Sequence, residues 1–180
     1  LIVDNEGELV QQLPEEDGFG DYPLTIAADL DGDDTMELVR GRDAFRFGAN
    51  NDVYYTSVLH AGFPSIADTD DDGLPEIFVA SDLGTSILEH DGTLLWDQFS
   101  SPDLGYPTAL PHAIHDFRGD GTRTVLGRTE FTFSLHEPND EMATIWQAVL
   151  GDDAFEFPGL SAFDFYGDGS PEVLGGTASN

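Results

Sequence analysis

Two acidic segments carry the residues whose types and spacing are most specific for a chemical task. Residues 29–37 read DLDGDDTME and residues 68–76 read DTDDDGLPE, so each places carboxylates at loop positions 1, 3, 5 and 9. Carboxylates packed this densely repel one another unless a cation lies between them. Calcium takes about six to eight oxygen ligands from carboxylates, backbone carbonyls and water. We therefore predict that both loops bind calcium.

The expected shell uses the alternate carboxylates, the carbonyl oxygen of position 7 and a bidentate Glu at position 9. The ligands are then Asp29, Asp31, Asp33, Thr35 and Glu37 in the first loop, and Asp68, Asp70, Asp72, Leu74 and Glu76 in the second loop. An EF-hand is excluded, because its bidentate Glu stands at about position 12 between helices, where these loops have Arg40 and Val79. The alternative for both segments is a pair of solvated acidic turns without a metal.

Two further segments have the same frame with fewer carboxylates. The third loop, residues 116–124, reads DFRGDGTRT, and the fourth loop, residues 164–172, reads DFYGDGSPE. In the third loop Arg118 replaces a carboxylate, leaving Asp116 and Asp120, so a fixed positive charge stands in for the metal and we expect no ion there. The fourth loop keeps three carboxylates, which with one carbonyl and water are enough for a third calcium site; these ligands are Asp164, Asp168, Ser170 and Glu172.

The elements that position these loops repeat along the chain. The first Asp of each loop stands at 29, 68, 116 and 164, which gives separations of 39, 48 and 48 residues. A Pro and a short apolar strand precede each loop. A second strand follows each loop, and hairpins such as 86–96 follow the first three. Four short strands in about 40–50 residues indicate a β-propeller blade. We therefore predict an all-β fold, with residues 1–180 forming one propeller domain or a piece of one.

Closure of the ring has two solutions. The fourth unit ends at its second strand near residues 175–177, and the N-terminal hairpin 1–11 has a sequence that parallels residues 87–96. The hairpin completes the last blade if the ring has four blades. It completes a preceding blade if the chain is about half of an eight-bladed ring, whose remainder is then a partner. The sequence leaves both open.

The Asp-x-Asp-x-Asp-Gly-x-x-Glu loops, the small strand before each loop and the apolar strand after it resemble the FG-GAP/VCBS repeat family, from about Tyr22 to Gly176. This family includes the propellers of integrin alpha subunits and of many secreted bacterial proteins. The resemblance implies that each loop joins the first two strands of a blade and binds calcium. It also implies a secreted or cell-surface location and a role in adhesion or ligand recognition.

Composition limits the partners. The chain of 180 residues has 36 acidic and 6 basic residues, all Arg, for a net charge of −30. This charge repels nucleic acid and anionic membrane surfaces. There is no Cys, and no apolar run reaches the roughly 20 residues that span a bilayer. Filling two calcium sites takes −30 only to −26, so most of the charge belongs to the solvated surface.

Two functions fit the sequence. The preferred one is a non-enzymatic extracellular module in which calcium is structural and which binds a protein or carbohydrate ligand. The alternative is the propeller of a secreted carbohydrate-active enzyme, similar to a polysaccharide lyase. His112 and His115 are the natural start of a catalytic site, but residues at i and i+3 of a strand lie on opposite faces and do not converge. Trp96 and Trp146 are expected to pack between blades.

Overall fold

The computed structural model describes residues 1–13, 24–48, 52–57, 62–81, 84–99, 111–128, 132–149 and 160–175. All regular structure in these ranges is β-strand, as expected from the sequence. Its strands are β1 (Ile2–Val3), β2 (Leu9–Gln11), β3 (Thr25–Ala28), β4 (Glu37–Arg40), β5 (Asp43–Arg46), β6 (Val53–Thr56), β7 (Phe63–Ala67), β8 (Glu76–Ser81), β9 (Gly84–Leu88), β10 (Leu94–Phe99), β11 (Ala113–His115), β12 (Thr124–Arg128), β13 (Thr132–Glu137), β14 (Ala143–Val149), β15 (Leu160–Phe163) and β16 (Glu172–Gly175). Within the described ranges there is no long apolar helix of the kind that crosses a membrane.

The strands form antiparallel sheets in chain order. Three are four-stranded: the first sheet is β3-β4-β5-β6, the second is β7-β8-β9-β10 and the third is β11-β12-β13-β14. Two are two-stranded, namely the hairpin β1-β2 and the fourth sheet β15-β16. Each acidic loop joins the first two strands of a sheet. In all four cases the residue before the loop pairs with loop position 9; the pairs are Ala28 with Glu37, Ala67 with Glu76, His115 with Thr124 and Phe163 with Glu172.

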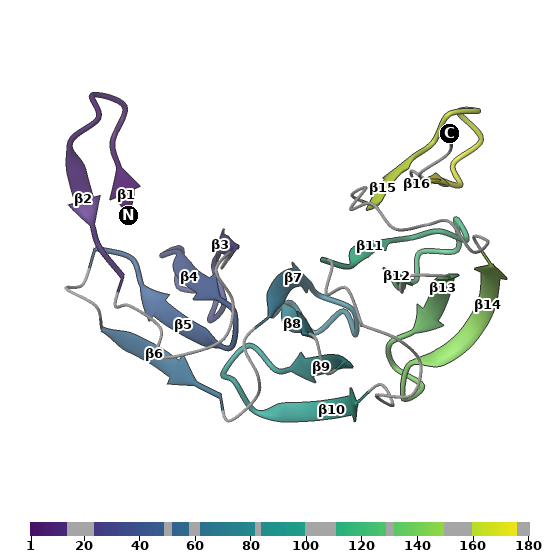
Figure 1. Cartoon of the computed structure of the whole chain (residues 1–180), viewed down its shortest axis with the longest axis horizontal. Coiled ribbons are helices and arrows are strands. Elements are labelled where there is room, and N and C mark those ends of the chain that lie inside the picture. The colour runs from purple at the N-terminus through teal and green to yellow at the C-terminus, as the bar shows by residue number, and fades with distance from the viewer. Residues whose placement is uncertain are drawn as a thin grey trace.

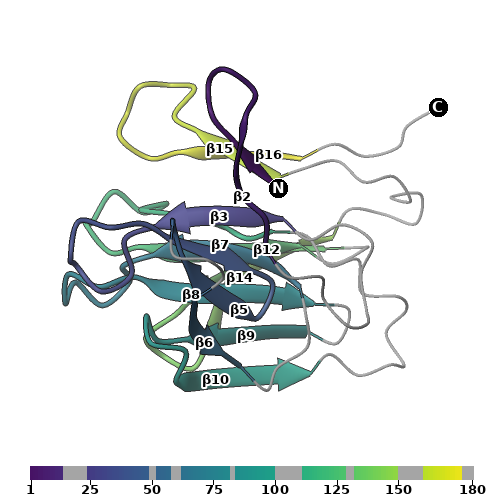
Figure 2. The same ribbon diagram turned by 90° about the vertical axis from the view of Figure 1, so that its left-hand side faces the viewer.

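The sheets follow one another along an open arc (Figure 1), with the first strand of each four-stranded sheet on the inner side and the last strand on the outer side. Strand β3 contacts β7, β7 contacts β11, and β11 contacts β15. The hairpin β1-β2 and the sheet β15-β16 lie at opposite ends of the arc. Seen from the side, the four acidic loops lie at the same edge of the molecule (Figure 2).

The core lies between the sheets. Strand β8 is buried along its whole length because it is sandwiched between the first and third sheets. Since its side chains alternate, Ile77 and Val79 join an apolar cluster with the first sheet, whereas Phe78 joins a cluster with the third. This explains the unbroken apolar run 77–80, which is typical of a strand buried on both faces. Buried apolar contacts between neighbouring sheets therefore hold the arc together.

The two Trp residues occupy matching places, opposite Ile87 on β9 and Leu135 on β13. Trp96 packs against the cluster between the second and third sheets, as expected for packing between blades. Trp146 is 39% exposed. The difference follows from the fourth sheet, which has only two strands in the described residues and no outer pair that lies over β14.

Candidate metal centres

The four acidic loops share one backbone frame. Positions 4 and 6 have positive φ in every loop; these residues are Gly32 and Asp34, Asp71 and Gly73, Gly119 and Gly121, and Gly167 and Gly169. Glycine adopts this conformation without strain, and Asp is among the few other residues that tolerate it. Glycine or Asp at positions 4 and 6 therefore permits the turn geometry that brings alternate side chains together.

The Asp at position 1 and the Glu at position 9 tie this frame together. In the second loop, Asp68 accepts hydrogen bonds from the amides of Asp71 at 2.7 Å and Gly73 at 3.2 Å. Oε2 of Glu76 accepts the Thr69 amide at 2.6 Å. The first loop repeats the pattern, since Asp29 accepts the Gly32 and Asp34 amides at 2.8 and 2.9 Å and Glu37 accepts the Leu30 amide at 2.9 Å. Each loop is thus closed by its own carboxylates.

In two loops, this frame gathers carboxylates closely enough for one ion. Ligand oxygens of Asp68, Asp70, Asp72 and Glu76 lie within 4.8 Å of one another, and so do those of Asp29, Asp31 and Glu37. Oxygens on opposite sides of a calcium ion, each about 2.3–2.6 Å from it, are about 5 Å apart. Both groups therefore fit a shared cation. Asp33 lies outside the first group; its Oδ1 accepts the Thr35 amide at 2.7 Å.

Two details bear on how a cation would be held. Oδ1 of Asp31 is buried and has no hydrogen-bond partner among the described residues, which is unusual for a carboxylate oxygen and would be explained by a cation. One oxygen of Glu37 and one of Glu76 also accept loop amides, as the oxygens of Asp29 and Asp68 do. Bidentate binding by the two Glu residues stays a prediction from the sequence.

The electrostatics also favour a cation. Burial raises the pKa of Glu37, although the Leu30 amide lowers it, and the charge of Asp31 raises it further. Burial likewise raises the pKa of Glu76, against the hydrogen bonds from Thr69. Glu89, which follows β9, is a fifth carboxylate near the second loop that sequence analysis missed. Its pKa is raised by burial and then by the charge of Asp70. Ile77 on β8 pairs with Leu88 on β9, and continuing this register by one residue places Glu89 beside Glu76.

The third loop is arranged around a guanidinium. Arg118 Nε lies 3.1 Å from an oxygen of Asp120, and Arg118 Nη2 donates to Glu137 at 2.9 Å. Hydrogen bonds from backbone amides, that of Gly121 first, lower the pKa of Asp116. At position 9, Thr124 donates to the His115 carbonyl at 3.3 Å. The metal-free third loop stays a prediction from the sequence.

The fourth loop keeps the frame but does not gather its acids in the same way. Asp164 accepts the Gly167 amide at 2.5 Å, Asp168 accepts the Ser170 amide at 3.0 Å, and Glu172 accepts the Phe165 amide at 2.8 Å. Among the described residues, these three carboxylates do not form a group within 4.8 Å. The third calcium site stays a prediction from the sequence.

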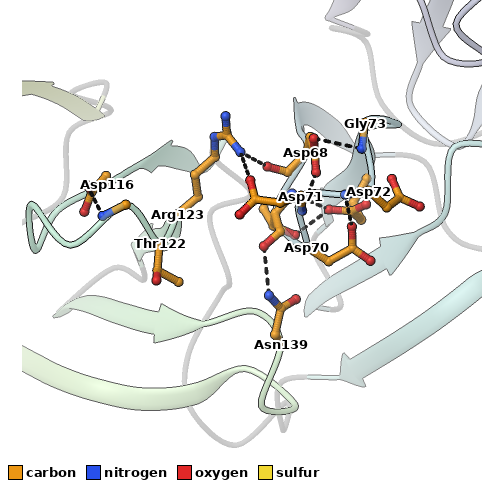
Figure 3. A network of polar contacts seen from close by, with 12 residues as sticks. Asp68, Asp70, Asp71, Asp72, Gly73, Asp116, Thr122, Arg123 and Asn139 are labelled. Carbon is orange, nitrogen blue, oxygen red and sulfur yellow. Dashed lines mark hydrogen bonds and ion pairs between the residues drawn. The ribbon is translucent and has the colours of Figure 1, made fainter.

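Two residues from the connections between strands of the third sheet reach the second loop, and sequence analysis missed both (Figure 3). Arg123 Nη1 donates to the carbonyl oxygen of Asp68 and pairs with Asp71 Oδ1 at 3.1 Å. Asn139, in the turn between β13 and β14, donates to the carbonyl oxygen of Thr69 at 2.8 Å. The sequence signal that could have singled out Arg123 is loop position 8, which is Met or Pro in the other loops and Arg in the third loop.

The two histidines do not converge. The ring of His112 lies between the second and third sheets, with Nε2 3.0 Å from Thr85 Oγ1 and Nδ1 buried without a partner among the described residues. Burial, and then the charge of His136, lower the pKa of His112 to about 4. His115 is exposed and its Nδ1 donates to the Asp116 carbonyl at 3.2 Å. His112 is therefore an interface residue.

Comparison with known proteins gives a fold relationship only. No protein-family model matches the sequence, and no curated protein matches it. Among solved structures, the chain is similar to the V. cholerae biofilm matrix protein Bap1, with a TM-score of 0.57 and 23% identity. The match covers 85% of this chain and 28% of the Bap1 chain. At this identity the likeness shows that the two chains share a fold, over just over a quarter of the Bap1 chain.

Proposed function

We propose that the chain is a run of β-propeller blades. Three antiparallel four-stranded sheets lie side by side with their first strands in consecutive contact, which is the arrangement of blades around an axis. The turn of the β1-β2 hairpin has the backbone hydrogen bonds of the β9-β10 turn: Asp4 N to Glu8 O at 3.0 Å matches Glu89 N to Thr93 O at 2.8 Å. The hairpin is thus the outer half of one blade, and β15-β16 is the inner half of another.

The position of these half-blades favours the larger ring. They lie at opposite ends of the arc (Figure 1), so neither completes the other within this chain. The ring we propose has more than four blades.

We propose further that the first and second loops bind calcium and that the ions are structural. The observation that carries this proposal is the convergence of Asp68, Asp70, Asp72 and Glu76 within 4.8 Å. Calcium suits a flexible shell of carboxylate oxygens, whereas magnesium demands compact octahedral geometry and keeps several waters. Each loop joins the two innermost strands of its sheet, so an ion stabilises the part of the blade that contacts its neighbours.

The biological role we propose is that of an extracellular scaffold or adhesion module. Bap1 is a biofilm matrix protein, and a matrix location supplies the calcium that such loops need. The innermost strands β3, β7, β11 and β15 carry one residue of the Arg, His and Tyr types, His115. The described residues therefore give the polysaccharide-lyase alternative no specific support. The ligand belongs to the class of matrix proteins or carbohydrates.

Calorimetric titration of the metal-free protein tests the calcium sites. We expect tighter binding of calcium than of magnesium. Asp31→Ala should remove the ion of the first loop, and Asp70→Ala the ion of the second, each leaving the other loop unaffected. Asp34→Asn is a matched control, because Asn tolerates the positive φ of Asp34, which belongs to the first loop but lies outside its carboxylate group. Magnesium binding as tight as calcium, or equal effects of Asp34→Asn and Asp31→Ala, would contradict the proposal.

A further inference from the structure

We infer that the third sheet positions the calcium loop of the second sheet through Arg123 and Asn139, which we call the cross-sheet pair. This inference rests on the proposed calcium binding by residues 68–76. It assigns a role in that site to two residues that belong to a different sheet and are not themselves ligands. Calcium affinity at the second loop then depends on how the third sheet packs against the second.

The contacts fall where the second loop begins. Arg123 donates to the carbonyl oxygen of Asp68, and Asn139 donates to the carbonyl oxygen of Thr69 at 2.8 Å (Figure 3). These two carbonyls belong to the peptide units between the ligand residues Asp68 and Asp70. Fixing these peptide units fixes the directions in which the Asp68 and Asp70 side chains leave the backbone. The cross-sheet pair therefore acts on the ligands through the backbone.

The cross-sheet pair acts by geometry more than by charge. The side chains of Arg123 and Asp71 are 42% and 76% exposed, and exposed ion pairs are screened by solvent. A positive charge beside the loop also opposes binding of a cation. The hydrogen bonds to the carbonyls have the opposite effect, because they hold the loop in its binding conformation before the ion arrives. We expect the second effect to dominate, since outer partners of metal ligands typically change affinity by about 10–100-fold.

The two arginines of the third loop are directed differently. Arg118 pairs with Asp120 and Glu137 inside the third unit. Its other arginine, Arg123, is directed to the neighbouring loop. The first loop meets its neighbour differently: a Cβ on Gly32 would lie 3.6 Å from Leu74 Cδ2, an apolar contact. The first loop is therefore an internal control for the second.

The experiment measures calcium affinity at one loop at a time. Asp31→Ala leaves the second loop to titrate, and Asp70→Ala leaves the first. Into each background we place Asn139→Ala and Arg123→Met. Arg118→Met is the matched control, because Arg118 belongs to the same third loop as Arg123. Asn139→Ala and Arg123→Met should each raise the calcium Kd of the second loop roughly tenfold. Neither should change the first loop, and Arg118→Met should change neither.

Two results would overturn the inference. One is an unchanged Kd of the second loop in Asn139→Ala, a variant that alters no charge. The other is tighter binding in Arg123→Met with wild-type affinity restored by Arg123→Lys, which would make the arginine a competing charge only. If the wild-type protein binds calcium at the second loop and these variants do not change its Kd, only the positioning role of the cross-sheet pair is refuted. A protein that binds no calcium at all refutes the proposed function as well.

A measurement on the metal-free protein distinguishes failure of the positioning role from failure of the proposed calcium binding. In EGTA, Asn139→Ala should speed hydrogen exchange at the amides of Asp71 and Gly73, which donate hydrogen bonds to the Asp68 carboxylate. The amides of Gly32 and Asp34 in the first loop should exchange as in the wild type. Unchanged exchange in the second loop would count against the positioning role even if calcium binds.

Discussion

At the scale of single residues, several loop carboxylates accept backbone hydrogen bonds and also belong to the groups that would hold an ion. Asp68 accepts two loop amides and also belongs to the group that would hold the ion. Asp72 likewise accepts the Leu74 amide at 2.8 Å. The hydrogen bonds fix the carboxylates before metal binding, which lowers the ordering cost of binding. Asp31 is different, because one of its oxygens is buried without a partner and is the atom that gains most from a cation.

His112 gives a prediction about pH at the residue scale. Its folded-state pKa of about 4 lies below the ordinary 6.5, so the folded protein takes up a proton less readily than the unfolded chain. Stability is therefore full above about pH 6.5 and falls as the pH drops towards 4. Between pH 7 and pH 5 the loss from this residue should be about 2 kcal/mol.

Urea unfolding at saturating calcium measures this loss. The surrounding groups are the Thr85 hydroxyl from β9, the Phe78 ring from β8 and the His136 ring from β13. In His112→Gln the drop in unfolding free energy between pH 7 and pH 5 should shrink by about 2 kcal/mol. His115→Gln, on the exposed side, should keep the wild-type drop. Equal pH dependence in the wild type and His112→Gln would show that the buried ring does not control this transition.

At the scale of elements, the third loop differs from the first two because it carries Arg118, which we propose takes the place of a metal ion. Chelation should leave residues 116–124 unchanged while residues 29–37 and 68–76 lose protection. Hydrogen exchange with and without EGTA, followed by mass spectrometry of the corresponding peptides, measures the difference. Equal loosening of all three loops would mean that Arg118 does not replace a metal.

Much of this element-scale organisation could be predicted from the sequence. The loop–strand pairs follow from acidic spacing and short apolar runs, and the loop register is the same in all four sheets. Contacts between elements could not be predicted. Arg123 reaches Asp68 only because two sheets pack side by side, and Glu89 approaches Glu76 through a hairpin register. Exclusion of Asp33 from the first carboxylate group depends on side-chain placement that loop spacing does not determine.

At the scale of the whole molecule, apolar packing between sheets stabilises the fold, whereas repulsion between the acidic loops at one edge destabilises it. Clusters between neighbouring sheets hold the arc together, whereas the acidic loops lie along one edge (Figure 2) of a chain with a net charge of −30. At an effective dielectric of about 20, two unit charges about 4 Å apart repel by roughly 4 kcal/mol before screening. A domain's total stability is about 5–15 kcal/mol. Repulsion within two metal-free loops is therefore large enough to affect the whole arc.

The last prediction is that chelation lowers the thermal midpoint of the whole protein. A ligand bound only by the folded state stabilises it by about 2.7 kcal/mol per site at a hundredfold excess over Kd. Two sites give about 5 kcal/mol, and each kcal/mol shifts the midpoint of a chain this size by about 2–4 °C. We therefore expect EGTA to lower the midpoint by about 10–20 °C at low salt, and less at high salt because salt screens the carboxylates. Asp31→Ala/Asp70→Ala should melt alike with and without EGTA. An unchanged wild-type midpoint at low salt would show that the ions do not stabilise the fold.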